Sequence, residues 1–267
     1  MTTRLPTYFV SHGGGPWPWM KDQWGDTFAK LEASLQDMPR QLGVKPKAVL
    51  MVSGHWEERD FTLSSGAHPG MLYDYYGFPE HTYHVQYPAP GSPELAQQVK
   101  ELLEAGSMTA RLDGERGFDH GTFTVMAPLY PQADIPVVQL SMKTGLDPQT
   151  HIDAGKLLAP LRDEGVVIIG SGLSYHNLRQ HYAHAAAPSR QFDDWLQETL
   201  LHSAPVVRYQ RLLEWSRAPA ARVAHPREDH LLPLMVAVGA AWDEGGTCVY
   251  HEDDFRGVIA VSSFRFG

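Results

Sequence analysis

The stretch Tyr8–Pro16 (YFVSHGGGP) decides how the rest of the sequence is interpreted. An apolar run ends in Ser-His, and three glycines and a proline follow, which is typical of a buried strand that leads into an open loop. Glycines allow the backbone of such a loop to approach a ligand closely. Because open α/β sheets bind ligands at the carboxyl ends of their strands, His12 is a candidate functional residue.

Two further runs of the sequence have the same form. Ala48–Trp56 (AVLMVSGHW) contains His55 just after its apolar part, and residues 166–171 (VVIIGS) are followed within a few positions by His176. Predicted strands alternate with predicted helices along the chain. We therefore expect residues 1–267 to form one catalytic domain, an α/β fold that is a three-layer α/β/α sandwich with a central mixed, mainly parallel sheet. The strands are expected at 5–12, 48–53, 108–112, 135–141, 166–171, 247–251 and 257–265, and the helices at 21–42, 92–105, 122–130, 148–164, 189–202, 205–217 and 229–242.

Two segments are expected to lack regular structure. Residues 61–90 are rich in Gly, Pro, Tyr and His, which predicts a long aromatic loop, and residues 219–226 form a Pro/Ala linker. Long loops in compact domains are often functional, so the aromatic side chains are expected either to wall a pocket or to cover an edge of the core.

Composition excludes several classes of function. The 267 residues are 43% hydrophobic and carry a net charge of −9, which argues against nucleic acid as a partner because phosphate binding needs a basic face. No apolar stretch reaches the roughly 18 residues of a membrane span, so no membrane partner is expected. The N-terminus lacks the apolar core of a signal peptide, which predicts a cytoplasmic location. The single cysteine, Cys248, excludes an intrachain disulfide and a Cys-rich zinc site.

Five of the 14 histidines are candidate metal ligands or catalytic groups. His12, His55 and His176 follow predicted strands, His120 lies in a Gly-Phe-Asp-His-Gly loop, and His230 opens a predicted helix. A lone histidine in such a place is more often structural than a ligand. Repetition at matching strand ends favours a shared site, because those ends converge at one edge of a parallel sheet. Imidazole is the commonest protein metal ligand and suits zinc, iron and copper.

Other motifs in the sequence give little support to a different kind of functional site. The three glycines lack the Lys-Ser/Thr of a phosphate-binding loop and the GxGxxG spacing, and neither a zinc-protease His-Glu-x-x-His nor a Cys-x-x-Cys is present. Ser11, Ser53 and Ser171 lack the GxSxG context of a serine hydrolase. His225 is an alternative ligand for which we favour a structural role. Carboxylates beside the candidate ligands are either groups that orient imidazoles or solvated side chains, namely Glu57, Glu58, Glu228 and Asp229. The remaining histidines are interpreted as ordinary, namely His68, His81, His84, His151, His181, His184, His202 and His251, with a place near the pocket left open for His81 and His84.

Six motifs occur in register along the chain: SHGGGP at 11–16, SGHW at 53–56, YPAPG at 87–91, GFDHG at 117–121, HNL at 176–178 and DHLLPL at 229–234. Together they resemble the class III extradiol ring-cleavage dioxygenases, a LigB-like superfamily, and within it the DOPA-dioxygenase-like branch. The resemblance runs from about residue 6 to residue 265. Each motif is weak alone, but six in order are highly specific.

The resemblance implies a single non-haem metal ion held by His12, His55 and His230. His176 is then a fourth ligand without substrate or the acid/base with it, and His120 hydrogen-bonds substrate or oxygen. The protocatechuate branch has a glutamate as its third ligand, where this sequence offers His230. Iron(II) is expected for activity, although three or four imidazoles also bind zinc(II) well.

The implied reaction inserts both atoms of O2 into a small aromatic diol, a catechol of DOPA-like or related type, and gives a muconic semialdehyde. Residues 73–87, Trp17 and Trp19 are expected to wall the pocket. The alternative function is a zinc-binding hydrolase or a non-catalytic metal-binding protein on the same scaffold. The resemblance leaves open whether the protein is a monomer or a homodimer.

Overall fold

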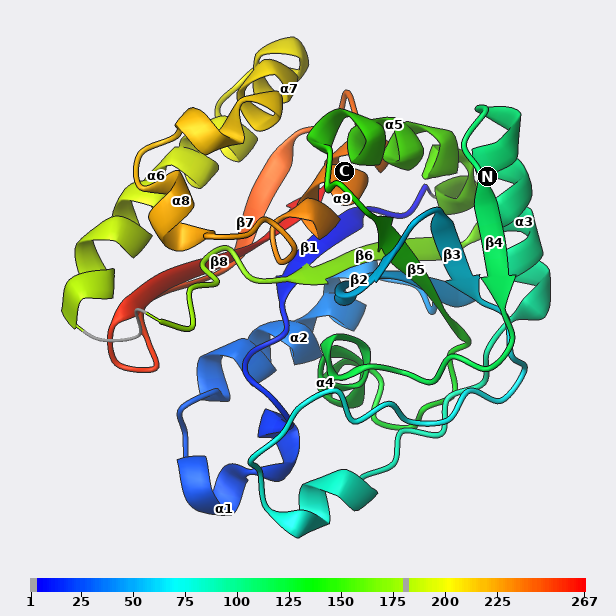
Figure 1. The fold of residues 1–267 in the computed structure, drawn as a ribbon, viewed down its shortest axis with the longest axis horizontal. Coiled ribbons are helices and arrows are strands. Elements are labelled where there is room, and N and C mark those ends of the chain that lie inside the picture. The colour runs from blue at the N-terminus through cyan, green and yellow to red at the C-terminus, as the bar shows by residue number, and fades with distance from the viewer. Residues whose placement is uncertain (1–3, 180–182) are drawn as a thin grey trace.

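A computed structural model describes residues 4–179 and 183–267; His181, expected above to be an ordinary histidine, lies outside these ranges. The described chain forms one eight-stranded sheet with the order β4-β3-β5-β2-β6-β1-β8-β7 (Figure 1). The strands are β1 (Thr7–Ser11), β2 (Ala48–Glu58), β3 (Phe61–Ser64), β4 (Ala110–Asp113), β5 (Val137–Lys143), β6 (Val166–Gly172), β7 (Gly246–Phe255) and β8 (Ile259–Phe266).

The centre of this sheet is parallel. β6 pairs in parallel with both β1 and β2, and β2 pairs in parallel with β5. β8 runs antiparallel to β1, and β3 runs antiparallel to β5, so the sheet is mixed. The carboxyl ends of β1, β2 and β6 therefore meet at one edge. This confirms the predicted fold class, and it follows from strands that are apolar throughout because helices cover both of their faces.

Helices lie on both faces of the sheet (Figure 1). α2 and α4 contact each other on one side, while α5 packs against α9 on the other, and α9 lies on β6 and β1. The helices are α1 (Lys21–Trp24), α2 (Ala29–Leu42), α3 (Pro93–Ala105), α4 (His120–Leu129), α5 (Pro148–Leu158), α6 (Ala186–Leu201), α7 (Pro205–Leu213), α8 (Ala221–Ala224) and α9 (Leu232–Ala240). Short 3-10 helices are Trp17–Trp19, Glu80–His84, Ala159–Glu164, Ala183–Ala185 and Trp215–Arg217. None of the described helices is long and apolar enough to cross a membrane.

Some predicted boundaries were wrong. The helix expected at 21–42 is interrupted at Gly25, whose φ of 51° is incompatible with a continuous right-handed helix. The loop expected at 61–90 begins with β3, and the linker expected at 219–226 contains α8. β2 continues past 53 to Glu58 through a register shift between Val52 and Glu57. A bulge of this kind re-aims side chains next to active sites, and His55 lies within it.

Candidate metal centre

Backbone contacts position the candidate histidines at the carboxyl edge of the central strands. The N–H of His12, just after β1, donates to the carbonyl of Gly172 at the end of β6, 3.0 Å away. The carbonyl of His12 accepts from the indole of Trp17 at 2.8 Å. His230 is joined to the residue after β6, because Leu173 donates its N–H to the His230 carbonyl at 3.0 Å. Residues 12, 172 and 230, distant in sequence, are thus held side by side.

Glycines permit this close approach. A methyl group on Gly172 would lie 2.1 Å from the carbonyl oxygen of His230, and one on Gly121 would lie 2.9 Å from Cδ2 of His55. Such contacts are shorter than a real side chain tolerates, so glycine is required at both positions for the histidines to come together.

Three imidazole nitrogens converge at this edge. Nε2 of His55 lies 3.2 Å from Nε2 of His12 and 3.1 Å from Nε2 of His230. His12 and His230 are buried, and His55 is partly buried. Each ring nitrogen has a single in-plane proton or lone pair, so Nε2 of His55 is unable to form a good hydrogen bond to both neighbours.

Carboxylates determine which nitrogen of two of these rings carries the proton. Oδ2 of Asp229 lies 3.0 Å from Nδ1 of His230, and Oδ2 of Asp74 lies 3.3 Å from Nδ1 of His55. A carboxylate accepts a hydrogen bond from a protonated Nδ1, which leaves Nε2 as the lone-pair nitrogen. Bare lone pairs at 3.1 Å repel each other, and a bound cation relieves that repulsion. The donor set therefore fits a metal ion.

Burial keeps these three imidazoles in their neutral, ligating form. The pKa of His12, His55 and His230 is held well below its usual range, first by burial and then by the neighbouring imidazoles, which disfavour a second positive charge. Nδ1 of His12 is also buried with no hydrogen-bond partner within the described ranges. Neutral imidazole is the form that binds a metal ion.

His120 occupies the first turn of α4 beside the same cluster. Asp119 caps this helix by accepting from the N–H of Thr122 at 3.0 Å, and it also accepts from Ser53 Oγ at 2.8 Å and pairs with Arg116 at 3.1 Å. Burial raises the pKa of Asp119. The Nδ1 of His120 donates to Asp74 Oδ1 at 2.8 Å.

Asp74 therefore holds two imidazoles with its two oxygens, those of His55 and His120. Asp74 was not among the residues predicted for the site from the sequence. It lies in the long aromatic loop among tyrosines, and no local motif distinguishes it from a solvated carboxylate.

His176 stacks on His230, with ring centroids 3.4 Å apart and ring planes inclined by 13°. Two compact groups of possible ligands result. One is His12, His55 and His120, and the other is His176, Asp229 and His230. The groups adjoin through the His55–His230 contact, so all five predicted histidines lie in one cluster.

Apart from Asp229, the alternative ligand and the adjacent carboxylates considered above do not join the cluster. Nε2 of His225 lies 3.0 Å from the carbonyl of Ser174, and its ring contacts Phe192 and Trp215. Of the four adjacent carboxylates, only Asp229 holds a cluster imidazole within the described ranges. Glu57 pairs with Arg227, Glu58 accepts from Trp56, and Glu228 pairs with Arg222.

A cavity of about 470 Å³ opens above the histidines. The aromatic loop contributes Tyr75, Tyr76 and Phe78 to its wall, as expected. Trp17 and Trp19 were expected at this wall, but neither is among the described lining residues, and Trp24 lines it instead. Trp17 is buried against Phe28, with ring centroids 5.2 Å apart.

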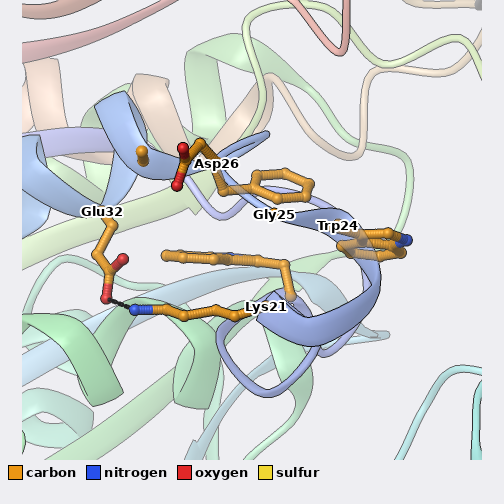
Figure 2. A pocket seen from close by; sticks show the side chains of 8 residues that line it. Lys21, Trp24, Gly25, Asp26 and Glu32 are labelled. Atoms are coloured by element: carbon orange, nitrogen blue, oxygen red, sulfur yellow. Dashed lines mark hydrogen bonds and ion pairs between the residues drawn. The ribbon is translucent and has the colours of Figure 1, made fainter.

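Trp17 lines a separate, smaller cavity of about 70 Å³ (Figure 2). Lys21 and Glu32 form an ion pair of 2.7 Å there, and Figure 2 shows Trp24 lying away from that pair. This space is too small for an aromatic ring and lacks the histidines, so the larger cavity is the candidate active site.

Comparison with known proteins agrees with this geometry. The family model described as "Catalytic LigB subunit of aromatic ring-opening dioxygenase" matches residues 6–266. The chain belongs to the LigB family. Within the family, it is 40% identical over 266 residues to the 4,5-DOPA dioxygenase extradiol of Portulaca grandiflora, covering 97% of this chain and 95% of that protein. It is 36% identical over 248 residues to the Escherichia coli K12 protein of the same name, covering 91% and 87%.

A solved structure shares the architecture of this LigB-family chain. The crystal structure of an uncharacterised protein from Escherichia coli K12 superposes with a TM-score of 0.77 at 31% identity, covering 99% of this chain and 100% of that one. The protein is an aromatic ring-opening extradiol dioxygenase of the LigB family, similar to 4,5-DOPA dioxygenases, and its histidine cluster is a possible metal site. Both the predicted family and the predicted enzyme class are confirmed.

Proposed function

We propose that this dioxygenase opens the ring of a catechol with a short side chain, using one iron(II) ion bound by His12, His55 and His230. The observation that carries the proposal is the convergence of three Nε2 atoms at 3.1–3.2 Å on the floor of the large cavity. The DOPA named for the plant and bacterial relatives is such a catechol. The product is a muconic semialdehyde.

The choice of His230 over His120 as the third ligand rests on the direct contact of its Nε2 with His55. Three neutral imidazoles with open positions beside them suit a non-haem iron that must also accept substrate. When bound, iron(II) supplies the redox route by which triplet dioxygen reacts with a singlet ring. Zinc(II) fits the same imidazoles and can occupy the purified protein.

The two remaining histidines are assigned to proton transfer. We assign His176, stacked on His230 at the cavity, as the base that takes a proton from a catechol hydroxyl, since imidazole suits this role near neutral pH. His120 donates a hydrogen bond or a proton later in the reaction. Asp74 accepts from its Nδ1 at 2.8 Å and compensates the positive charge of the protonated ring.

The cavity wall orients the ring and restricts water. Tyr75 and Phe78 pack edge to face, with centroids 5.3 Å apart, and Tyr75 also contacts His120 at 5.7 Å. An aromatic wall of this kind favours a flat ring by edge and face contacts. Gly15 leaves space for Phe78, because a methyl group there would lie 2.4 Å from its ring.

Reconstitution tests the proposal. The metal-free protein is loaded with iron(II) under argon and mixed with a panel of catechols in aerobic buffer, and oxygen uptake and the visible absorption of the semialdehyde are followed. We expect one O2 consumed for each ring opened, and no turnover with zinc(II). An iron-loaded, folded protein that opens no catechol, or a zinc-loaded protein that hydrolyses esters or amides, would contradict the proposal.

A further inference from the structure

The large cavity contains one cationic side chain that the proposed reaction does not use. Among its described lining residues, Arg256 is the only arginine or lysine, and Asp74 is the only carboxylate. Both oxygens of Asp74 are occupied by His55 and His120. A bound molecule in this cavity therefore meets one positive charge that is distinct from the histidine cluster.

Arg256 is not neutralised by the described part of the protein. The acidic residues Glu252 and Asp254, which border a neighbouring hollow with it, pair with Lys30 at 3.5 and 3.1 Å. Asp26 borders the same hollow and forms no ion pair with Arg256 in the described chain. By contrast, Arg116 beside the cluster pairs with Asp119 at 3.1 Å.

The guanidinium lies against the glycine-rich loop. A methyl group on Gly14 would be 3.6 Å from Nη1 of Arg256, in ordinary van der Waals contact. Gly14 is two positions beyond His12 in the sequence, and all three residues line the same cavity. Arg256 is thus placed at the mouth of the cavity, on the side of the glycine loop.

The turn that carries Arg256 is a poor place for an arginine. The N–H of Val258 donates to the carbonyl of Phe255 at 3.2 Å, which closes a β-turn within the three-residue connection between β7 and β8. Both central residues are left-handed, with φ of 51° at Arg256 and 82° at Gly257. Such turns prefer Asn-Gly, and an arginine at the first position lowers stability because its Cβ crowds the backbone at positive φ. The reason for an arginine lies outside the turn.

We infer that Arg256 binds a carboxylate on the side chain of the aromatic diol and so selects anionic catechols over neutral ones. This inference rests on the proposed catechol reaction and names the substrate class for it. A guanidinium binds a carboxylate through two parallel N–H···O bonds, which fix orientation as well as charge. With the diol at the histidines, the carboxylate of the same molecule is directed toward Arg256, which lines the same cavity.

Two substrates that differ in one charge test the inference: 3-(3,4-dihydroxyphenyl)propanoate and its methyl ester. In the iron-loaded enzyme, Arg256→Asn is expected to lower kcat/KM for the acid about tenfold to a hundredfold, through KM, because a hydrogen bond to a charged group is lost. For the ester the change is expected to stay below about twofold. Asn suits the turn, so the melting temperature is expected to hold or rise.

Arg190→Gln is the matched control. Arg190 lies on α6, is exposed, pairs with Asp253 at 3.8 Å and is not among the lining residues of the cavity. Its replacement removes one positive charge from the protein without changing either substrate's kinetics. Arg256→Lys is expected to recover part of the preference for the acid, because it keeps the charge but not the bidentate geometry.

Measuring substrate binding under argon separates the proposed role of Arg256 from the proposed ring-opening reaction. Calorimetry gives Kd for the acid and the ester without turnover, with wild type and Arg256→Asn. If the iron-loaded wild type opens neither compound, the proposed reaction fails, and the Kd comparison still decides the role of Arg256. Equal losses for acid and ester, or no loss for either, would overturn the assignment of Arg256.

Discussion

Arg162 and His12 are both buried beside the central strands, at opposite ends of the sheet. At the amino end, the Arg162 guanidinium donates to the carbonyls of Leu5 and Ala240 at 2.5 and 2.7 Å and pairs with Glu244 at 2.6 Å. At the carboxyl end, Nε2 of His12 meets another imidazole, and its Nδ1 has no hydrogen-bond partner in the described chain. At the amino end, groups of the protein itself satisfy the hydrogen-bonding capacity of the buried side chain. At the carboxyl end the described chain leaves that capacity unsatisfied, as in a site that a ligand completes.

Removing an imidazole from the carboxyl end is expected to have the largest effect. His12→Ala, His55→Ala and His230→Ala should each abolish stoichiometric iron(II) binding and ring opening, since two imidazoles hold the ion poorly. Metal content after anaerobic loading, measured by mass spectrometry, checks this result.

His225 and His120 provide the comparison variants. We expect His225→Phe and His120→Ala to keep the metal, with the latter lowering turnover. If His230→Ala retained full metal occupancy while His225→Ala or His120→Ala lost it, the third ligand would be assigned to the wrong residue.

Removing the charge from the amino end is expected to affect stability rather than function. Arg162→Met removes four hydrogen bonds and leaves the carboxylate of Glu244 without its buried partner, which should lower the free energy of unfolding by about 3 kcal/mol. Urea titration measures this change. Metal content and kcat per folded molecule should match wild type, and a large loss of either would show that the two ends are not separate.

Asp74→Asn tests how much the carboxylate that holds two imidazoles contributes to metal affinity and activity, compared with a ligand. Loss of a carboxylate behind ligating histidines typically lowers metal affinity or activity by about tenfold to a hundredfold. Competition with a chelator gives the affinity, and oxygen uptake gives the activity. Asp134→Asn, at an exposed carboxylate paired with Lys45, is the control and should behave as wild type. Wild-type behaviour of Asp74→Asn would contradict the proposed role.

The smallest expected effect concerns pH. Burial lowers the pKa of His225 to about 3, from about 6.5 in the unfolded chain. Below pH 6.5 the unfolded state takes up a proton that the folded state does not, so stability falls as the pH falls toward 3. Between pH 6.5 and 5.5 the contribution is about 1 kcal/mol. Unfolding of metal-free wild type and His225→Phe at both values checks this, and equal pH slopes would contradict it.

The sequence alone determined the fold class and the five clustered histidines. Apolar runs such as Tyr8–Val10 and Val166–Ile169 are short enough for strands and are followed by glycines, and parallel strands of this kind place their ends at one edge. Strand-end position is a local property of the chain, which is why His12, His55 and His176 were identifiable. His120 and His230 were candidates from their positions in a loop and at a helix start, and the family resemblance implied a role for each of the five.

Only the tertiary structure decided which other residues join the site. Asp74 contacts two imidazoles from the aromatic loop, about 20 residues beyond the bulge in β2. Arg256 lines the cavity from the turn between β7 and β8, near the other end of the chain. Trp24 lines the cavity in place of the expected Trp17 and Trp19, and the ring of Trp17 is buried against Phe28 instead. These outcomes depend on how distant segments pack. The end of a strand can be predicted from the local sequence. The partner of a loop side chain is decided only when the fold brings the two residues together.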